Sequence, residues 1–302
     1  MVSKRKVLGV GGLVAVGLAM TGAQGHRQAD PYASLPSSLQ LSAVVRDFKG
    51  SNLTGGHLDF ERTPSAGYGQ YAQMVNDSLD ADGKPVFKTA GRRVSTTWKD
   101  VNNRPTIDTR SYITAKTGDR VGAMATGTGG ASQSATTFAQ WYRDIPGTNA
   151  SKLITLNLVR TANTNTYTFN DQTDSYYTGR GGFFPIDGEL LGNSSGSKNF
   201  SFTTEIDTNF EFQRGTGQLF TFTGDDDVWV FIDGKLVVDL GGVHSAASQS
   251  IELDRLAWLT SGNTYRLKIF HAERHTTQSN FRIDTTLQLR TIEQPAVNGL
   301  YD

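Results

Sequence analysis

The sequence predicts an all-β fold: a sandwich or barrel with long loops and one or two short helices. Of 302 residues, 33 are Gly, 10% are aromatic and only 19% are charged. Thr and aromatic residues favour strands and Gly favours turns, whereas helical proteins lean on Ala, Leu, Glu and Lys. From residue 153 onward, short apolar or alternating segments are separated by turn residues, with no sustained helical periodicity and no fixed-period repeat.

The first half of the chain contains few predicted elements. Residues 41–48 are expected to form a strand, residues 70–79 a short helix, and residues 136–144 one or two helical turns. Pro146 and Gly147 then stop the chain from continuing as a helix. Residues 49–58 are expected to be a Gly-rich loop, residues 80–85 a turn, and the polar residues 108–130 an exposed loop.

The second half is predicted to be a series of short strands. In residues 153–159, Ile154, Leu156 and Leu158 fall on one face. Asp233-Gly234 between two apolar runs is a strong hairpin signal, and the first of those runs is apolar on both faces, which places it inside the sheet. The remaining expected strands are 166–169, 200–206, 210–212, 219–223, 228–232, 235–239, 265–270 and 281–289.

Charge and cysteine content exclude several classes of protein. The chain has no Cys, which excludes disulfide frameworks, zinc–thiolate sites, iron–sulfur clusters and thiol nucleophiles. Its formal net charge is zero and it has no long basic run, so nucleic acid is not an expected partner.

Residues 1–25 have the pattern of a secretory signal. Lys4, Arg5 and Lys6 precede an apolar stretch over 7–20, and small residues follow it. The stretch is short for a membrane span, which needs about 20 apolar residues, although an uncleaved anchor is an alternative. Cleavage would leave 26 basic and 29 acidic residues, a net charge of −3, and no membrane span.

We therefore expect a secreted, extracellular or cell-surface protein. Small eukaryotic secreted domains usually carry cysteines, so the sequence favours a bacterial exported protein. Residues 26–40 are expected to be a linker, 41–292 a single domain, and 293–302 a C-terminal tail.

An ordered series of motifs resembles the fibro-slime domain, a family of exported microbial proteins related to the PA14 superfamily. The resemblance spans roughly residues 41–290 and implies a PA14-like β-sandwich or barrel in a surface or matrix protein. The matching motifs are Val45–Phe48, His57–Glu61, Asp82–Val86, Phe138–Gly147, Phe183–Gly188, Thr223–Asp239, Leu240–His244 and Glu273–Thr286.

The resemblance also implies a calcium site. In carbohydrate-binding relatives, two adjacent aspartates joined by a cis peptide hold a calcium ion, which in turn holds sugar hydroxyls. The matching positions are Asp225 and Asp226, and Asp227 stands where many members have Gly, which leaves the register open by one residue. Three consecutive carboxylates repel one another unless a cation or hydrogen-bond donors neutralise them. Calcium, with six to eight oxygen ligands, is one solution, and capping of a strand end by loop amides is the other.

A second cluster lies in the segment from His271 to His275. On a strand, His271, Glu273 and His275 would share a face, and could bind a transition metal. Alternatively the segment is structural, with Glu273 paired to Arg274 or Arg282. In a third interpretation, Glu273 or Asn280 contributes an oxygen ligand to the same site as the aspartates, and His244 lies close to that site. The candidate metal ligands are thus Asp225, Asp226, Asp227 and Glu273, and the candidate ligand-binding residues are Asp225, Asp226, His244, His275 and Asn280.

The sequence favours a non-enzymatic binding module: calcium-dependent recognition of a glycan or polysaccharide in adhesion or extracellular matrix. A structural matrix component with protein partners is the alternative. A glycoside hydrolase is a further alternative, but its two carboxyls must face each other across a sugar cleft, a geometry that neighbouring aspartates rarely meet.

The aromatic residues have two interpretations, core packing or platforms for sugar rings. Trp229 and Phe231 lie in the apolar hairpin and are expected to be core. Both interpretations stay open for the aromatic residues nearer loops, which are Trp98, Trp141, Tyr142, Tyr176 and Tyr177.

Overall fold

A computed structural model describes residues 1–2 and 29–291. The predicted signal segment, apart from its first two residues, and the predicted tail lie outside the described residues. Within the described part, no helix is both long enough and apolar enough to cross a membrane.

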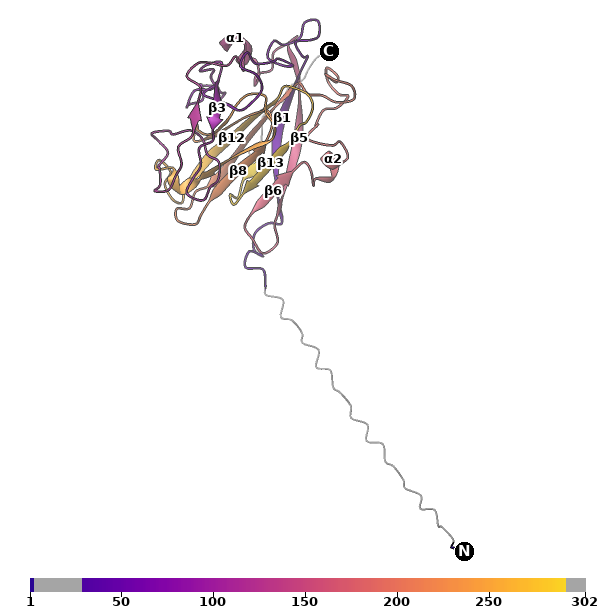
Figure 1. Cartoon of the computed structure of the whole chain (residues 1–302), viewed down its shortest axis with the longest axis vertical. Helices are drawn as coiled ribbons and strands as arrows, with labels where there is room; N and C mark the ends of the chain where they lie inside the picture. The colour runs from indigo at the N-terminus through magenta and orange to yellow at the C-terminus, as the bar shows by residue number, and fades with distance from the viewer. Residues whose placement is uncertain (3–28, 292–302) are drawn as a thin grey trace.

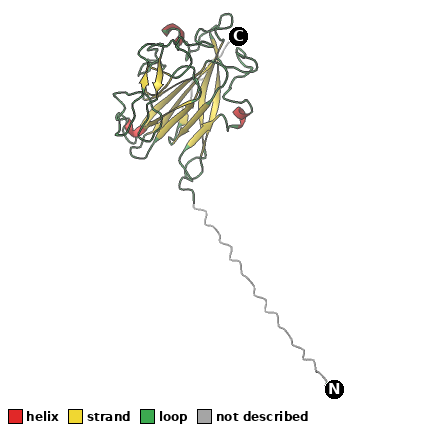
Figure 2. Ribbon diagram, viewed as in Figure 1, coloured by secondary structure: helices red, strands yellow, loops and turns green. Residues whose placement is uncertain are grey.

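Among the described residues, nearly all of the regular secondary structure is β-strand, as the composition predicts, and long loops connect the strands (Figures 1 and 2). The two helices are single turns, and a short 3-10 helix, η1 (Leu253–Arg255), follows β11. The elements are β1 (Ser38–Phe48), β2 (Tyr71–Ala72), β3 (Arg92–Thr96), β4 (Ala123–Met124), α1 (Ala135–Phe138), β5 (Asn149–Arg160), β6 (Tyr167–Asn170), α2 (Ser175–Thr178), β7 (Phe202–Glu211), β8 (Leu219–Gly224), β9 (Asp227–Ile232), β10 (Lys235–Leu240), β11 (Ala247–Glu252), β12 (Thr264–Glu273), β13 (Phe281–Thr285) and β14 (Arg290–Thr291).

One large antiparallel sheet forms a nearly closed barrel. Its strand order is β10-β9-β12-β7-β1-β5-β6-β13-β8-β11, with β14 also paired to β7. The two end strands meet through Gln249, whose side chain accepts from the backbone N–H of Asp239 (2.8 Å) and donates to its carbonyl (3.0 Å). A separate small sheet, β2-β3-β4, lies among the N-terminal loops.

The barrel has two hydrophobic cores, one on each side of β9. Val228, Val230 and Ile232 belong to a large core rich in Phe, whereas Trp229 and Phe231 belong to a second core formed with residues of the N-terminal loops. This arrangement confirms that the 228–232 strand is buried on both faces and that Trp229 and Phe231 are core. It also ties the loops of the first half to the sheet.

Several predicted elements are confirmed. The Asp233-Gly234 hairpin joins β9 to β10, and both turn residues have positive φ (51° and 76°). In β5, Leu156 and Leu158 are fully buried while Leu153 and Val159 are exposed, as the alternation predicts. β1 begins at Ser38, so the last residues of the predicted linker belong to the sheet.

Three predictions were wrong. The expected strand 281–289 is β13, which ends at Thr285. Residues 70–79 contain no helix, because Tyr71 and Gly241 exchange backbone hydrogen bonds (2.6 and 2.8 Å) and hold the segment extended. The expected strands 200–206 and 210–212 are one strand, β7, since β12 pairs with its whole length. The strand β11 was not anticipated from the sequence.

Candidate functional site

The three consecutive aspartates lie where the chain passes from β8 to β9. Asp225 and Asp226 form the connection, and Asp227 begins β9. The Asp225–Asp226 peptide bond is cis, the geometry that the resemblance implied for this pair. All three side chains are buried, so their charges are held away from bulk water.

Asp225 is held by the segment that precedes β13. Its carboxylate accepts hydrogen bonds from the backbone N–H of Asn280 (2.5 Å) and from the Asn280 side-chain amide (2.8 Å). Its backbone carbonyl is 2.8 Å from Nε2 of His271. Burial raises the pKa of the Asp225 carboxyl to about 6, against the lowering effect of the Asn280 hydrogen bonds.

Asp226 and Asp227 face different groups. One oxygen of Asp226 accepts from the backbone N–H of His244 and the other from that of Arg274, both at 3.1 Å. Asp227 accepts from the backbone N–H of Gly242 (2.5 Å) and forms a fully buried ion pair with Nε of Arg274 (2.5 Å). Loop amides therefore do hold these aspartates, as one of the two sequence interpretations required.

Glu273, the last residue of β12, lies fully buried beside this cluster. Among the described residues, no donor makes a hydrogen bond of ordinary geometry to its carboxylate, although the Ser279 hydroxyl and the His275 backbone N–H lie close enough to lower its pKa. Burial raises the pKa of Glu273 well above its usual value, and the negative charges of Asp226 and Asp225 raise it further. Four carboxylates thus share a buried region in which Arg274 supplies the compensating positive charge.

Asp225 and Asp226 line a solvent-accessible cavity of about 200 Å³. His244 and His275, from two other loops, also line it, so four of the five predicted ligand-binding residues meet there. Asn280 lies behind Asp225 and lines a neighbouring cavity instead. The full lining is Tyr68, Asp225, Asp226, Val243, His244, Ser245, His275, Thr276, Thr277 and Gln278.

Tyr68 is a member of this site that the sequence did not point to. Its hydroxyl is 2.8 Å from Nε2 of His275 and 2.9 Å from the hydroxyl of Thr63. It belongs to an N-terminal loop, and no motif connects it to His275, which lies 207 residues later in the chain. The N-terminal half therefore contributes directly to the cavity.

The expected His271–Glu273–His275 face does not form. The strand ends at Glu273, so His275 turns into the loop beside Tyr68. His271 lies among Phe rings, 5.2 Å from the ring centre of Phe281, and burial lowers its pKa to about 4. Within 29–291, no three His, Asp or Glu side chains are placed together as a metal cluster. The structural interpretation of this segment is the one that the geometry favours, although its pairing differs: Arg274 pairs with Asp227, and Arg282 with Asp284.

Residues 160–298 match the PA14 domain family. This segment, just under half of the chain, is similar to the PA14 domain. The match contains the three aspartates, Glu273 and the strands from β6 to β14, and it confirms the resemblance to the PA14 superfamily and the all-β fold.

The matches to similar proteins cover more of the chain than the PA14 match does, including residues before 160. Protein psiC of Dictyostelium discoideum is 32% identical over 268 residues, which are 86% of this chain and 43% of that protein. Proteins psiD and psiR of the same organism are 38% and 33% identical over 83% and 84% of this chain, and the matches cover 42% and 22% of their lengths. The chain therefore spans less than half of these relatives. They come from an amoeba, so the bacterial origin that the sequence favoured is not supported.

Two solved PA14 structures overlap with parts of the chain. The PA14 sugar-binding domain from an RTX adhesin is 19% identical, with a TM-score of 0.23 over 30% of this chain and 49% of that one. The PA14 domain of the MpAFP antifreeze protein is 12% identical, with a TM-score of 0.24 over 45% of this chain and 80% of that one. The family assignment rests on the sequence match and on the strands that it contains.

Proposed function

We propose that this protein is a non-enzymatic binding module that recognises a glycan at the cavity lined by Asp225 and Asp226, with the help of calcium. The observation that carries the proposal is the group of buried carboxylates at this cavity, for which Arg274 supplies one compensating positive charge. Asp225 and Asp226 line its wall, and Glu273 lies buried with no hydrogen bond of ordinary geometry to its carboxylate from the described residues. Carboxylates grouped in this way raise one another's pKa unless a cation joins them.

The donor chemistry fits calcium. Calcium prefers six to eight oxygen ligands at about 2.3–2.6 Å, and a carboxylate can supply one or two. Asp225, Asp226 and Glu273 would supply carboxylate oxygen, with main-chain carbonyls, water and ligand hydroxyls as the further donors. Asn280 would hold Asp225 in place, because its amide nitrogen donates to that carboxylate. We propose that Asp227 instead positions the site, because it does not line the cavity and its carboxylate forms a fully buried ion pair with Arg274. A bound calcium ion would neutralise the cluster and attract hydroxyl oxygens.

The rest of the cavity suits a small polar ligand. Tyr68, His244 and His275 present hydroxyl and imidazole groups, and Thr276, Thr277 and Gln278 form the rim. Such groups donate and accept hydrogen bonds in the patterns that vicinal sugar hydroxyls require. The small volume argues for one sugar unit at this site, in preference to a folded protein surface.

We further propose that the protein acts outside the cell, in adhesion or extracellular matrix. The signal pattern of residues 1–25 supports export. Matrix proteins are the alternative partners, and binding of a matrix protein without any glycan would favour that alternative.

A glycan array probed with and without calcium tests the proposal, alongside calcium titration by calorimetry. We expect saturable calcium binding, glycan signals that disappear in EDTA, and a melting temperature that rises with calcium. Asp226→Asn should weaken calcium binding by at least about tenfold. Asp82→Asn, at a side chain that is 76% exposed, is the matched control and should behave as wild type.

Two outcomes would overturn the proposal. Calcium that leaves the melting temperature and the array unchanged would remove the metal from the mechanism. Release of free sugar from array glycans would show a hydrolase instead of a binding module.

A further inference from the structure

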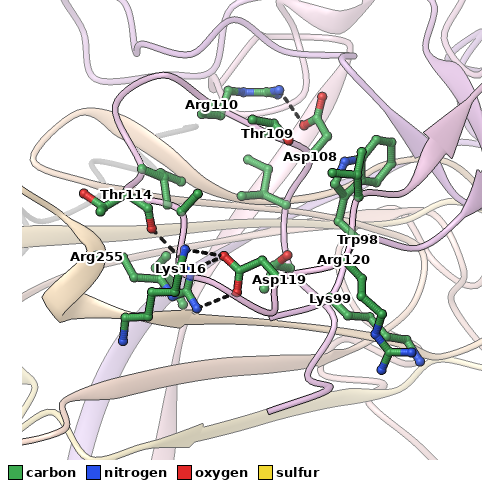
Figure 3. A pocket seen from close by; sticks show the side chains of 16 residues that line it. Trp98, Lys99, Asp108, Thr109, Arg110, Thr114, Lys116, Asp119, Arg120 and Arg255 are labelled. Carbon is green, nitrogen blue, oxygen red and sulfur yellow. Dashed lines mark hydrogen bonds and ion pairs between the residues drawn. The ribbon is translucent and has the colours of Figure 1, made fainter. Parts of the chain in front are cut away.

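A second cavity, of about 250 Å³, lies on a different part of the barrel (Figure 3). It is enclosed by the loop from Trp98 to Val121, by Ile251 of β11 and by Arg255 of η1. The Asp225 cavity lies at the other end of β11, because Ala247 pairs with Gly224, whereas Ile251 lies four residues further along. At about 3.3 Å per residue, the two sites are separated by roughly 13 Å of strand.

One side of this cavity is fixed by paired charges. Asp119 accepts two hydrogen bonds from the Arg255 guanidinium (2.6 and 2.9 Å) and one from the backbone N–H of Lys116 (2.8 Å). The Arg255 hydrogen bonds lower the pKa of Asp119 to about 2. The Lys116 ammonium pairs with Glu252 (2.6 Å). Cations on this side are therefore already neutralised.

The opposite side holds two cations that no carboxylate neutralises. Lys99 and Arg120 form an antiparallel bridge in which each backbone N–H donates to the other's carbonyl (3.0 and 2.8 Å). Residues paired in this way project from the same face, and like charges directly opposite each other are unfavourable. Among the described residues, no Asp or Glu lies within ion-pair distance of either side chain, and Arg120 reaches only the amide oxygen of Asn103.

Trp98 adds a flat apolar surface to the lining of the same cavity. Its indole packs on Gly122, where a Cβ would lie only 2.6 Å from the ring, so the absence of a side chain permits the close contact. The ring is half-buried and lines the cavity, and the buried side chains of Ile107 and Ile251 lie further in. Figure 3 shows Trp98, Lys99 and Arg120 on the side of the view away from the Lys116–Asp119–Arg255 group, with the indole extending away from the charged ends of Lys99 and Arg120.

We propose that this cavity binds a short segment of an anionic polysaccharide. The carboxylate or sulfate of one sugar would lie between Lys99 and Arg120, relieving their repulsion, and the apolar face of a neighbouring sugar ring would pack on Trp98. An aromatic surface and paired cations in one cavity match a chain of acidic sugars better than an acidic peptide, which offers charge without a flat apolar face. The two aspartates that line this cavity, Asp108 and Asp119, are each paired with an arginine (2.5 and 2.6 Å), so we expect binding here to need no calcium and to be independent of the Asp225 cavity.

The test measures binding of three probes in EDTA: trigalacturonate for carboxylated sugars, a heparin-derived tetrasaccharide for sulfated ones, and tetraglutamate for charge alone. We expect one or both sugars to bind more tightly than the peptide. The Lys99→Ala/Arg120→Ala double variant should lose about tenfold or more in affinity. Trp98→Ala should weaken sugar binding severalfold and leave any peptide binding unchanged. Lys49→Ala, at an exposed lysine elsewhere, is the matched control.

The outcomes separate this site from the proposed calcium site. Asp226→Asn should leave these affinities unchanged, so failure of one proposal does not decide the other. Absence of binding by both sugars, or equal binding of sugars and peptide with no effect of Trp98→Ala, would overturn the inference. A near-ultraviolet circular dichroism spectrum matching wild type establishes that each variant is folded.

Discussion

Arg274 is the residue on which the buried charge cluster depends. It is fully buried, pairs with Asp227, and donates from Nη1 to the backbone carbonyls of Asp59 (3.1 Å) and Ala131 (2.9 Å). Arg274→Met should destabilise the protein by about 3–5 kcal/mol, because it leaves a buried carboxylate without its partner. Adding Asp227→Asn should recover part of that loss. Urea unfolding of both single variants and the double variant measures the coupling, and simple additivity would contradict the ion pair's role.

The buried carboxyl of Asp47, which lies away from the candidate site, should make the stability of the protein depend on pH. Its carboxylate is fully buried in β1 and accepts from Asn199 and from the backbone N–H of Leu191, both at 2.7 Å. Burial raises its pKa to about 6 from 3.8. The folded state therefore binds this proton more tightly than the unfolded state does, so the ionised carboxyl costs stability that returns as the pH falls through about 6 toward 4.

Comparison with Asp47→Asn isolates this effect from other titrating groups. As the pH rises from about 4 to 6.5, wild type should lose stability relative to the variant, by at most about 3 kcal/mol. Chemical unfolding of both proteins across that range is the measurement. Parallel pH profiles would show that Asp47 does not titrate there.

At the level of single residues, the sequence predicted the site residues that lie close together in one short motif. Asp225, Asp226 and His244 belong to neighbouring loops of one hairpin region, and all three line the cavity. The partner of Arg274 could not be found in the same way. Adjacent strand residues point to opposite faces, so Arg274 cannot share a side with Glu273, and its partner Asp227 comes from the adjoining strand.

At the level of structural elements, the two turns that flank β10 require glycine for different reasons. Gly234, before the strand, has φ of 76° with open space around it, whereas Gly242, just after it, has φ of 90° and a Cβ there would lie 2.3 Å from the Tyr71 ring. Gly234→Ala should cost about 1 kcal/mol for the left-handed backbone alone. Gly242→Ala should cost clearly more, because Tyr71 would also have to move. Thermal unfolding compares the two, and equal losses would contradict the steric argument.

Elements whose pairing is distant in sequence were the ones mispredicted. The segment from 70 to 79 has a composition that permits a helix, but Tyr71 bonds to Gly241 and Gln73 has φ of 62°. In β7, the polar residues Asp207, Thr208 and Asn209 suggested a break between two strands. They stay in the strand because β12 pairs with them, and Asp207 forms an ion pair with Arg266. Local propensity yields to such long-range pairing.

At the level of the whole molecule, stability without cysteines comes from one continuous barrel. β1 lies between β7 and β5, and residues such as Leu41 and Val45 are fully buried in the main core. The second core depends on N-terminal residues such as Phe60, Tyr71 and Trp141, which cover Trp229. The segments before residue 160 therefore pack as part of the same fold, although the PA14 match begins only at residue 160.

This dependence predicts how the chain responds to truncation. A fragment of residues 160–298 keeps β6 to β14 but loses β1 and all but the last residue of β5, so the edges of β6 and β7 and the apolar surface around Trp229 become exposed. Open strand edges and uncovered apolar surface favour aggregation over folding. We expect the fragment to lack a cooperative thermal transition and near-ultraviolet dichroism, whereas residues 26–302 show both. A cooperatively folded, monomeric 160–298 fragment would show that the N-terminal half is an accessory layer, and that the barrel closes without β1.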